Sequence, residues 1–105
     1  MLIHKISDTI VFNALKNIKH GFLKITKIDG EILKFGNPED NLKVSLTIKD
    51  ESLTYNLIKS GSIGLGESYM KDFFITNNLS DLIELTARNI KTIYKFSGIF
   101  DLPLI

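Results

Sequence analysis

The sequence contains no cysteine and no tryptophan. Without cysteine the chain cannot form disulfides, use a thiolate nucleophile or bind zinc and iron–sulfur clusters through sulfur. Small secreted domains often depend on disulfides, so this absence favours an intracellular protein. Histidine is scarce as well. His4 and His20 lie sixteen residues apart, which is not a metal-ligand spacing, so we expect no metal site.

Arginine is almost absent. Arg88 is the only arginine among 13 basic residues, and 12 acidic residues reduce the net charge to +1. Binding of nucleic acid through its phosphates needs a concentrated basic face, and arginine is the preferred bidentate reader of phosphate and guanine. We therefore expect no nucleic-acid partner.

Long hydrophobic runs are also missing. The uninterrupted apolar runs are as short as Ile10-Val11-Phe12, far below the ~20 residues of a membrane span. Charged residues interrupt the first residues too early for a signal peptide. We expect a cytoplasmic protein, for which peripheral contact with the inner face of the membrane stays open.

The residues that are present suit one globular domain. The 105 residues are 44% hydrophobic and 24% charged, which fits a single domain over residues 1–105. A nucleotide-binding domain with its own substrate pocket rarely fits in this length. A binding, accessory or interaction module is therefore favoured over an enzyme.

Hydrophobic periodicity predicts an α+β fold. Helical spacing of apolar residues indicates helices over residues 2–18, 51–60 and 79–95, with one more helical turn at 67–72. Alternation and short apolar runs indicate strands over residues 22–27, 31–36, 42–49 and 73–75. Because consecutive strands are usually neighbours, we expect the first three to form a small antiparallel meander packed with the helices.

The loop Ile28-Asp29-Gly30 determines the register of the first two strands. A three-residue loop, with Gly30 in the left-handed region, pairs Leu23 with Phe35 and Ile25 with Leu33 on one face. A two-residue Asp-Gly turn would set these apolar residues against polar ones. Because the buried face specifies register, we expect the three-residue loop.

Capping residues mark the ends of the helices. Gly21 suits the end of the first helix, Asp50 the N-cap of the second, and Gly61 its stop. Asn78, with Asp81 three residues later, caps the last helix. The expected apolar face of that last helix consists of Leu79, Leu82, Ile83, Thr86, Ile90 and Ile93.

The segment Gly61-Ser62-Ile63-Gly64-Leu65-Gly66 suggests a phosphate-binding loop. However, Glu67 follows where the Walker pattern needs lysine, and the glycine spacing is not that of the dinucleotide fingerprint. A carboxylate at position 67 would also repel phosphate. The glycines are better explained by a tight backbone path between two helices, and we expect no nucleotide cofactor.

Residues 67–74 combine polar and aromatic side chains. No histidine lies near Glu67-Ser68-Tyr69 in the sequence, so acid–base catalysis is not expected there. Met70, Phe73 and Phe74 form an apolar cluster that would suit an acyl chain, because methionine adapts to flexible apolar ligands. Core packing is the commoner role of such residues.

Three lysines share one face of the predicted sheet. Lys24, Lys43 and Lys49 alternate with apolar residues along their strands. Such a face would attract anionic lipid. An ordinary solvated strand face is the alternative.

Several segments together form a recognisable pattern. The shorter ones are Gly21-Phe22-Leu23-Lys24-Ile25, Ile28-Asp29-Gly30, Phe35-Gly36, Leu79-Ser80-Asp81-Leu82 and Ala87-Arg88-Asn89. The most specific is Gly61-Ser62-Ile63-Gly64-Leu65-Gly66-Glu67-Ser68-Tyr69-Met70. From about residue 15 to 90 the sequence resembles the N-terminal domain of bacterial cyclopropane-fatty-acyl-phospholipid synthases, with its G-x-x-G-x-G-E-x-Y-M signature. It departs from the family at Lys71-Asp72-Phe73-Phe74, which keeps aromatic bulk but lacks the family's turn glycine.

This resemblance implies a fold and a role. The family's N-terminal domain is a small α+β module akin to the sterol-carrier-protein lipid-binding fold. Methyl transfer from S-adenosylmethionine belongs to a following methyltransferase domain, which has no counterpart in these residues. We therefore expect no catalytic residue and no cofactor. The expected module binds a phospholipid or fatty acyl chain, or docks onto a separate methyltransferase chain. The implied lipid-binding or docking residues are Gly61, Gly64, Gly66, Glu67, Tyr69, Met70, Phe73 and Phe74.

Two alternatives stay open. The chain is a protein-interaction or structural domain without a lipid site, or it is a remnant of a split synthase gene. In the second case the apolar residues 96–105 are a junction rather than a packed tail. An apolar end also leaves a homodimer open, because hydrophobic patches often mark contact sites.

Overall fold

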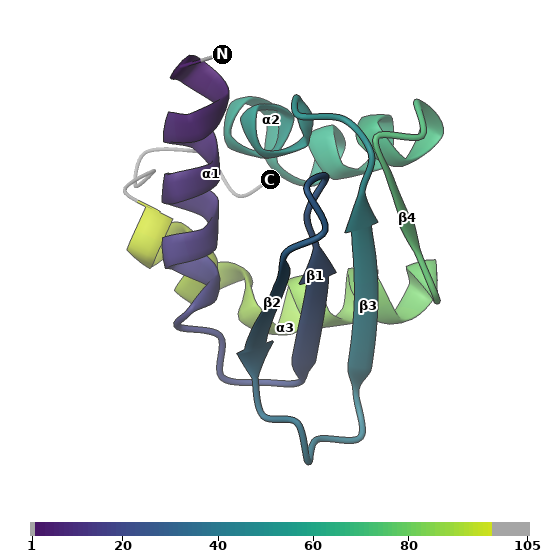
Figure 1. Ribbon diagram of the computed structural model, residues 1–105. Coiled ribbons are helices and arrows are strands. Elements are labelled where there is room, and N and C mark those ends of the chain that lie inside the picture. The colour runs from purple at the N-terminus through teal and green to yellow at the C-terminus, as the bar shows by residue number, and fades with distance from the viewer. Residues whose placement is uncertain (1, 98–105) are drawn as a thin grey trace.

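The computed structural model describes residues 2–97 and has a two-layer α+β architecture (Figure 1). The elements in chain order are α1 (Leu2–Leu15), β1 (Phe22–Thr26), β2 (Ile32–Gly36), β3 (Lys43–Ile48), α2 (Leu53–Met70), β4 (Phe74–Thr76) and α3 (Leu79–Ser97). The four strands form one sheet, and the three helices pack on the same face of it. The predicted α+β class is confirmed.

The neighbour of β3 is β1 and not β2. The sheet order is β2-β1-β3-β4; β1 pairs antiparallel with β2 and parallel with β3, and β3 pairs antiparallel with β4. The predicted antiparallel meander is therefore wrong, and the sheet is mixed. Burial of Val44, Leu46 and Ile48 shows the predicted alternation, but alternation fits either neighbour equally well.

The loop over residues 37–42 carries the chain past the start of β1. The N–H of Gly21 donates to Asp40 Oδ2 at 3.1 Å, and the N–H of Phe22 donates to the oxygen of Leu42 at 2.8 Å. The N–H of Leu42 donates to the other oxygen of Asp40 at 2.9 Å. These backbone donors, Leu42 first and then Gly21, hold the pKa of the Asp40 carboxyl below its ordinary value. The loop thereby delivers β3 to the free edge of β1.

The β1–β2 hairpin has the predicted register. Leu23 lies opposite Phe35 and Ile25 lies opposite Leu33. Gly30 has a φ of 92°, so the left-handed residue stands at the predicted end of the loop. The three-residue loop is confirmed.

The helix α3 has the predicted cap but a rotated buried face. Asn78 Oδ1 accepts the N–H of Asp81 at 3.0 Å, which confirms the cap. Ile83, predicted to be buried, is 54% exposed, whereas Leu85 and Asn89 are almost fully buried. The buried face differs because Asn89 bonds to the backbone of Lys19 and His20, in the segment between α1 and β1, and Leu85 packs into the core.

The other predicted helix ends also differ in detail. The helix α1 ends at Leu15, and Gly21, with a φ of 84°, leads into β1 instead of ending the helix. Asp50 is not the N-cap of α2: its side chain accepts the N–H of Ser52 at 2.8 Å, and the helix begins at Leu53. This bond forms a local turn just before the helix and gives the N–H of Ser52 a partner.

The helices and the sheet share one apolar core. Its buried members are Leu15, Ile18, Leu23, Ile25, Phe35, Val44, Leu46, Ile48, Leu53, Phe74, Leu82 and Leu85. None of the described helices covers the other face of the sheet. Within residues 2–97, no helix is long and apolar enough to cross a bilayer. The predicted tail or junction at 96–105 falls almost wholly outside the described residues.

Candidate functional site

The glycine-rich segment lies inside α2. This helix runs from Leu53 to Met70 but bends at Gly61, whose φ of 56° and ψ of −129° are not helical. The predicted helix stop at Gly61 is therefore a kink. The predicted turn at 67–72 mostly belongs to the second half of α2, so 51–60 and 67–72 are parts of one bent helix.

Two of the three motif glycines are needed for this bend. The backbone conformation of Gly61 is open to glycine alone, and a Cβ there would lie 2.5 Å from the hydroxyl of Tyr94. A Cβ on Gly64 would overlap the carbonyl oxygen of Asn56, so the second half of α2 packs directly on the backbone of the first. Gly66 faces open space. The motif thus shapes α2 through Gly61 and Gly64.

The remaining predicted site residues point in different directions. Glu67 is exposed, and Met70 is 77% exposed. The ring of Tyr69 packs on Phe74 with 5.8 Å between ring centroids, and Phe74 is fully buried in the core. Phe73 is half-buried at the edge of the same core. The structure therefore does not bring Met70, Phe73 and Phe74 around a common hollow.

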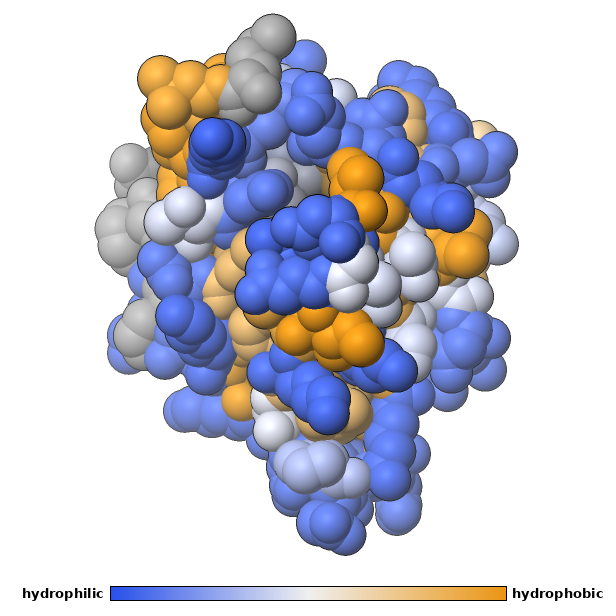
Figure 2. All heavy atoms as spheres, viewed as in Figure 1, coloured by the Kyte–Doolittle hydropathy of each residue, from blue (hydrophilic) through white to orange (hydrophobic). Residues whose placement is uncertain are grey.

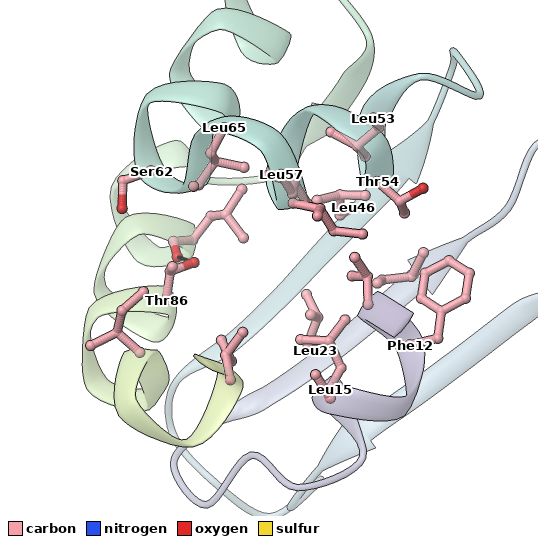
Figure 3. A pocket seen from close by; sticks show the side chains of 18 of the residues that line it. Phe12, Leu15, Leu23, Leu46, Leu53, Thr54, Leu57, Ser62, Leu65 and Thr86 are labelled. Carbon is pink, nitrogen blue, oxygen red and sulfur yellow. Dashed lines mark hydrogen bonds between the residues drawn. The ribbon is translucent and has the colours of Figure 1, made fainter. Parts of the chain in front are cut away.

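An apolar cavity of about 120 Å³ lies between the three helices and the inner face of the sheet (Figure 3). Phe12 and Leu15 of α1 and Leu23 of β1 line one end. Leu65 of α2 and Thr86 of α3 line the other end from opposite sides. Of the predicted site residues, only Gly61 contributes to the lining.

Three serine and threonine side chains, in addition to the phenol of Tyr94, interrupt the hydrocarbon lining. Thr54 Oγ1 donates to Asp8 at 2.6 Å, and Thr86 Oγ1 donates to the oxygen of Leu82 at 2.9 Å, so both protons are already used within the protein. Ser62 both lines the cavity and is exposed, which places an opening beside the kink of α2.

The lining determines what chemistry the cavity supports. Among the described residues, Tyr94 is the only ionisable side chain that lines it. The cavity suits the burial of an apolar group, and a charged group would be left without a partner.

Sequence reasoning missed these lining residues. Leu57, Leu65, Ile90 and Ile93 stand at helical spacing and are indistinguishable from ordinary core positions. Whether they touch or enclose a void depends on the angle at which α2 bends at Gly61. The one feature of the sequence that pointed to the cavity was Gly61, because it produces the bend.

A second hollow, of about 360 Å³, lies beside the tip of the β1–β2 hairpin and has a charged lining. Its charged side chains are Lys5, Asp8, Lys27, Asp29, Asp50 and Glu51. Lys27 is also bonded to Glu31 at 2.9 Å, which raises the pKa of the lysine. Within residues 2–97, no group of three His, Asp or Glu side chains is arranged to hold a metal ion. Mixed charges in an open hollow define no particular ligand.

The fold and the cavity define a small two-layer α+β domain with a partly open apolar cavity. The chain belongs to the family described as a domain of unknown function (DUF7884), which matches residues 10–97. No curated protein and no solved structure shows significant similarity to the chain. Because the family match runs from α1 to the end of α3, it includes the whole lining of the cavity.

Proposed function

We propose that this domain is a non-catalytic lipid-binding module that acts with a separate methyltransferase domain in cyclopropane fatty acid synthesis. The apolar cavity of about 120 Å³ is the observation that carries the proposal. The resemblance of Gly61–Met70 to the N-terminal domain of cyclopropane-fatty-acyl-phospholipid synthases supports the link to this lipid chemistry. A cytoplasmic protein in contact with the inner face of the membrane would meet such lipids.

The energetics of the cavity favour a ligand. A fully enclosed, empty void of 120 Å³ would lower stability by about 3 kcal/mol at about 24 cal/mol per Å³, which is the upper bound for this partly open cavity. That is a large share of the roughly 5–15 kcal/mol that stabilises a typical domain. A hydrocarbon segment in the void would restore the missing dispersion contacts. An apolar cavity of ~150 Å³ in another protein binds benzene, so the size suits a slim acyl segment.

The lining also indicates how a fatty acid would lie. The end formed by α1 and the sheet is hydrocarbon apart from Thr54, whose hydroxyl donates to Asp8, whereas Ser62 and Thr86 lie at the end between α2 and α3 (Figure 3). The carboxylate would stay at Ser62, where the cavity reaches the surface. The chain would extend toward Phe12 and Leu23.

Binding of a fluorescent fatty acid in detergent-free solution tests the proposal. Leu65→Phe adds a ring inside the cavity, and Ile63→Phe adds similar bulk to the same helix at a side chain that is 72% exposed. We expect Leu65→Phe to weaken binding at least tenfold and Ile63→Phe to leave it unchanged, with both variants folded by circular dichroism. No binding by the unmodified chain, or unchanged binding by Leu65→Phe, would reject the cavity as the lipid site.

The absence of catalysis has its own test. The isolated domain, incubated with S-adenosylmethionine and an unsaturated phospholipid, should transfer no methyl group. Turnover by this chain alone would contradict the proposal.

A stripe on α2 supports docking onto a methyltransferase domain as a second candidate function. Ile63, Glu67 and Met70 follow helical spacing on one side of the second half of α2, and both apolar members are more than two-thirds exposed. Large exposed apolar side chains beside a charge are typical of contact surfaces. The double variant Ile63→Asp/Met70→Asp should lose binding to the methyltransferase domain and keep fatty-acid binding. Wild-type affinity of that double variant for the domain would exclude this surface.

A further inference from the structure

The outer face of the sheet, opposite the described helices (Figure 1), is a surface on which hydrophilic residues surround apolar ones (Figure 2), and the charged side chains that its strands turn outward are lysines. Strand alternation turns Lys24, Lys34 and Lys43 outward, because Leu23, Ile25, Phe35 and Val44 next to them are buried. None of the outward positions in the four described strands holds Asp or Glu. The chain as a whole has a net charge of only +1, so this face is markedly more basic than the average surface.

Two of these lysines stand directly opposite each other. Lys24 of β1 is the cross-strand partner of Lys34 of β2. Like charges in this position destabilise an antiparallel pair. Lys34 is exposed and Lys24 is half-buried, and an anionic partner would turn the repulsion between the two ammonium groups into attraction to the partner.

Apolar side chains lie in the adjacent row of the same face. The strand register aligns Ile32, Thr26, Thr47 and Ile75 across the four strands. Ile32 is 50% exposed and Ile75 is 52% exposed. Residues two apart on a strand are separated by about 7 Å, so this row lies next to the row of Lys24 and Lys34, and Lys43 lies one row further along.

We propose that the outer face of the sheet docks on an anionic phospholipid surface. The ammonium groups of Lys24, Lys34 and Lys43 reach the lipid phosphates, while Ile32 and Ile75 enter the interfacial layer. We choose this partner because its negative charge complements the lysines and because aliphatic side chains lie beside them on the same face. Nucleic acid fits less well, because single-stranded binders stack bases on aromatic rings, and Phe22 is the one aromatic side chain at these outward positions.

This proposal goes beyond lipid binding in the cavity. The cavity lies on the inner side of the sheet and the lysines lie on the outer side. Docking through the outer face leaves the α2 stripe of Ile63, Glu67 and Met70 free for a protein partner. The two proposals stand or fall separately, because fatty-acid binding in solution involves no lysine of the sheet.

Co-sedimentation with vesicles tests the proposal. Vesicles of phosphatidylglycerol and phosphatidylcholine should bind the chain at low salt, and vesicles of phosphatidylcholine alone should not. Each lysine at an anionic surface contributes about fivefold in affinity, so Lys24→Gln/Lys34→Gln should weaken binding about 25-fold. The control Lys59→Gln/Lys91→Gln removes the same charge from exposed positions of α2 and α3 and should change binding little.

Folding does not limit this test, because removal of the Lys24–Lys34 repulsion should leave the melting temperature unchanged or higher. No binding to anionic vesicles, or equal losses in the two double variants, would overturn the proposal. It would also be overturned if a single-stranded oligonucleotide displaced the vesicles and the same lysines governed its binding.

Discussion

The side-chain amide of Asn89 in α3 binds both backbone groups of His20. Its Oδ1 accepts the N–H of His20 at 3.0 Å, and its Nδ2 donates to the oxygen of His20 at 2.8 Å. The same amide also accepts from the N–H of Lys19 and donates to the oxygen of Leu85. Asn89 is 1% exposed and fully bonded, and it ties the segment between α1 and β1 to α3.

Loss of this amide should be costly. Asn89→Ala leaves the two N–H groups and the carbonyl of residues 19–20 without their partner, so we expect the free energy of unfolding to fall by about 3 kcal/mol. Urea denaturation measures it. The control Asn13→Ala, on the exposed side of α1, should change stability by less than about 0.5 kcal/mol. Equal losses of stability in the two variants would show that the hydrogen bonds of Asn89 to residues 19–20 do not stabilise the fold.

Substitution by alanine should have opposite effects on stability at Gly61, where α2 bends, and at Gly66, five residues later. Gly61→Ala meets both a forbidden backbone conformation and the Tyr94 hydroxyl, so stability should fall by about 2–3 kcal/mol. Gly66→Ala meets open space within the helix and should raise stability by about 0.5–1 kcal/mol. Thermal unfolding separates the two outcomes, and a stabilising Gly61→Ala would contradict the kink.

The end of α2 holds a non-glycine residue in a left-handed conformation. Asp72 has a φ of 60°, and the N–H of Phe73 donates to the oxygen of Ser68 at 2.8 Å in the pattern that usually places glycine at this position. Asp72→Gly should therefore raise the free energy of unfolding by about 0.5 kcal/mol. Asp72→Ala keeps the Cβ strain and removes the carboxylate, so it should lower stability. If both changes had the same sign, relief of backbone strain would not be the cause.

The bonds to Asp40 make stability depend on pH. Because the backbone donors depress the pKa of this carboxyl in the folded chain, its contribution is complete above the unfolded-state pKa and disappears as pH falls through the folded-state value. Asp40→Asn should thus be less stable than the unmodified chain at neutral pH. The difference should shrink below about pH 4, near the ordinary pKa of aspartate. Urea denaturation of both proteins across that pH range checks the result. A stability difference that does not change with pH would show that the charge of Asp40 is not its cause.

The sequence alone predicted those features of the fold that depend on the burial of one strand face or on a short local spacing of residues. The pairing of Leu23 with Phe35 followed from the need to bury both, and the cap at Asn78 followed from a local spacing. The neighbour of β3 could not follow from alternation, because Val44 and Leu46 are buried beside either strand. That choice depends on the contact of Gly21 with Asp40, which lies nineteen residues away in the chain.

The candidate site was predicted less completely than the fold. The motif glycines were assigned a backbone role, and Gly61 has one, but the lining of the cavity comes from residues of α1, α3 and the sheet that carry no motif. Helix geometry alone does not reveal a void, because a small change in the bend at Gly61 would close it or widen it. The outer lysines were recognised in part: Lys24 and Lys43 were identified, whereas Lys34, which the alternation beside Leu33 and Phe35 also turns outward, was not.

The strand order has a consequence for synthesis on the ribosome. The strand β1 emerges from the ribosome before the others. β2 then pairs with one edge of β1 and β3 with the other edge, and β4 pairs with the outer edge of β3. Each new strand finds an edge already in place, and none has to be inserted between two partners. The sheet can therefore assemble outward from β1 in the order in which its strands emerge.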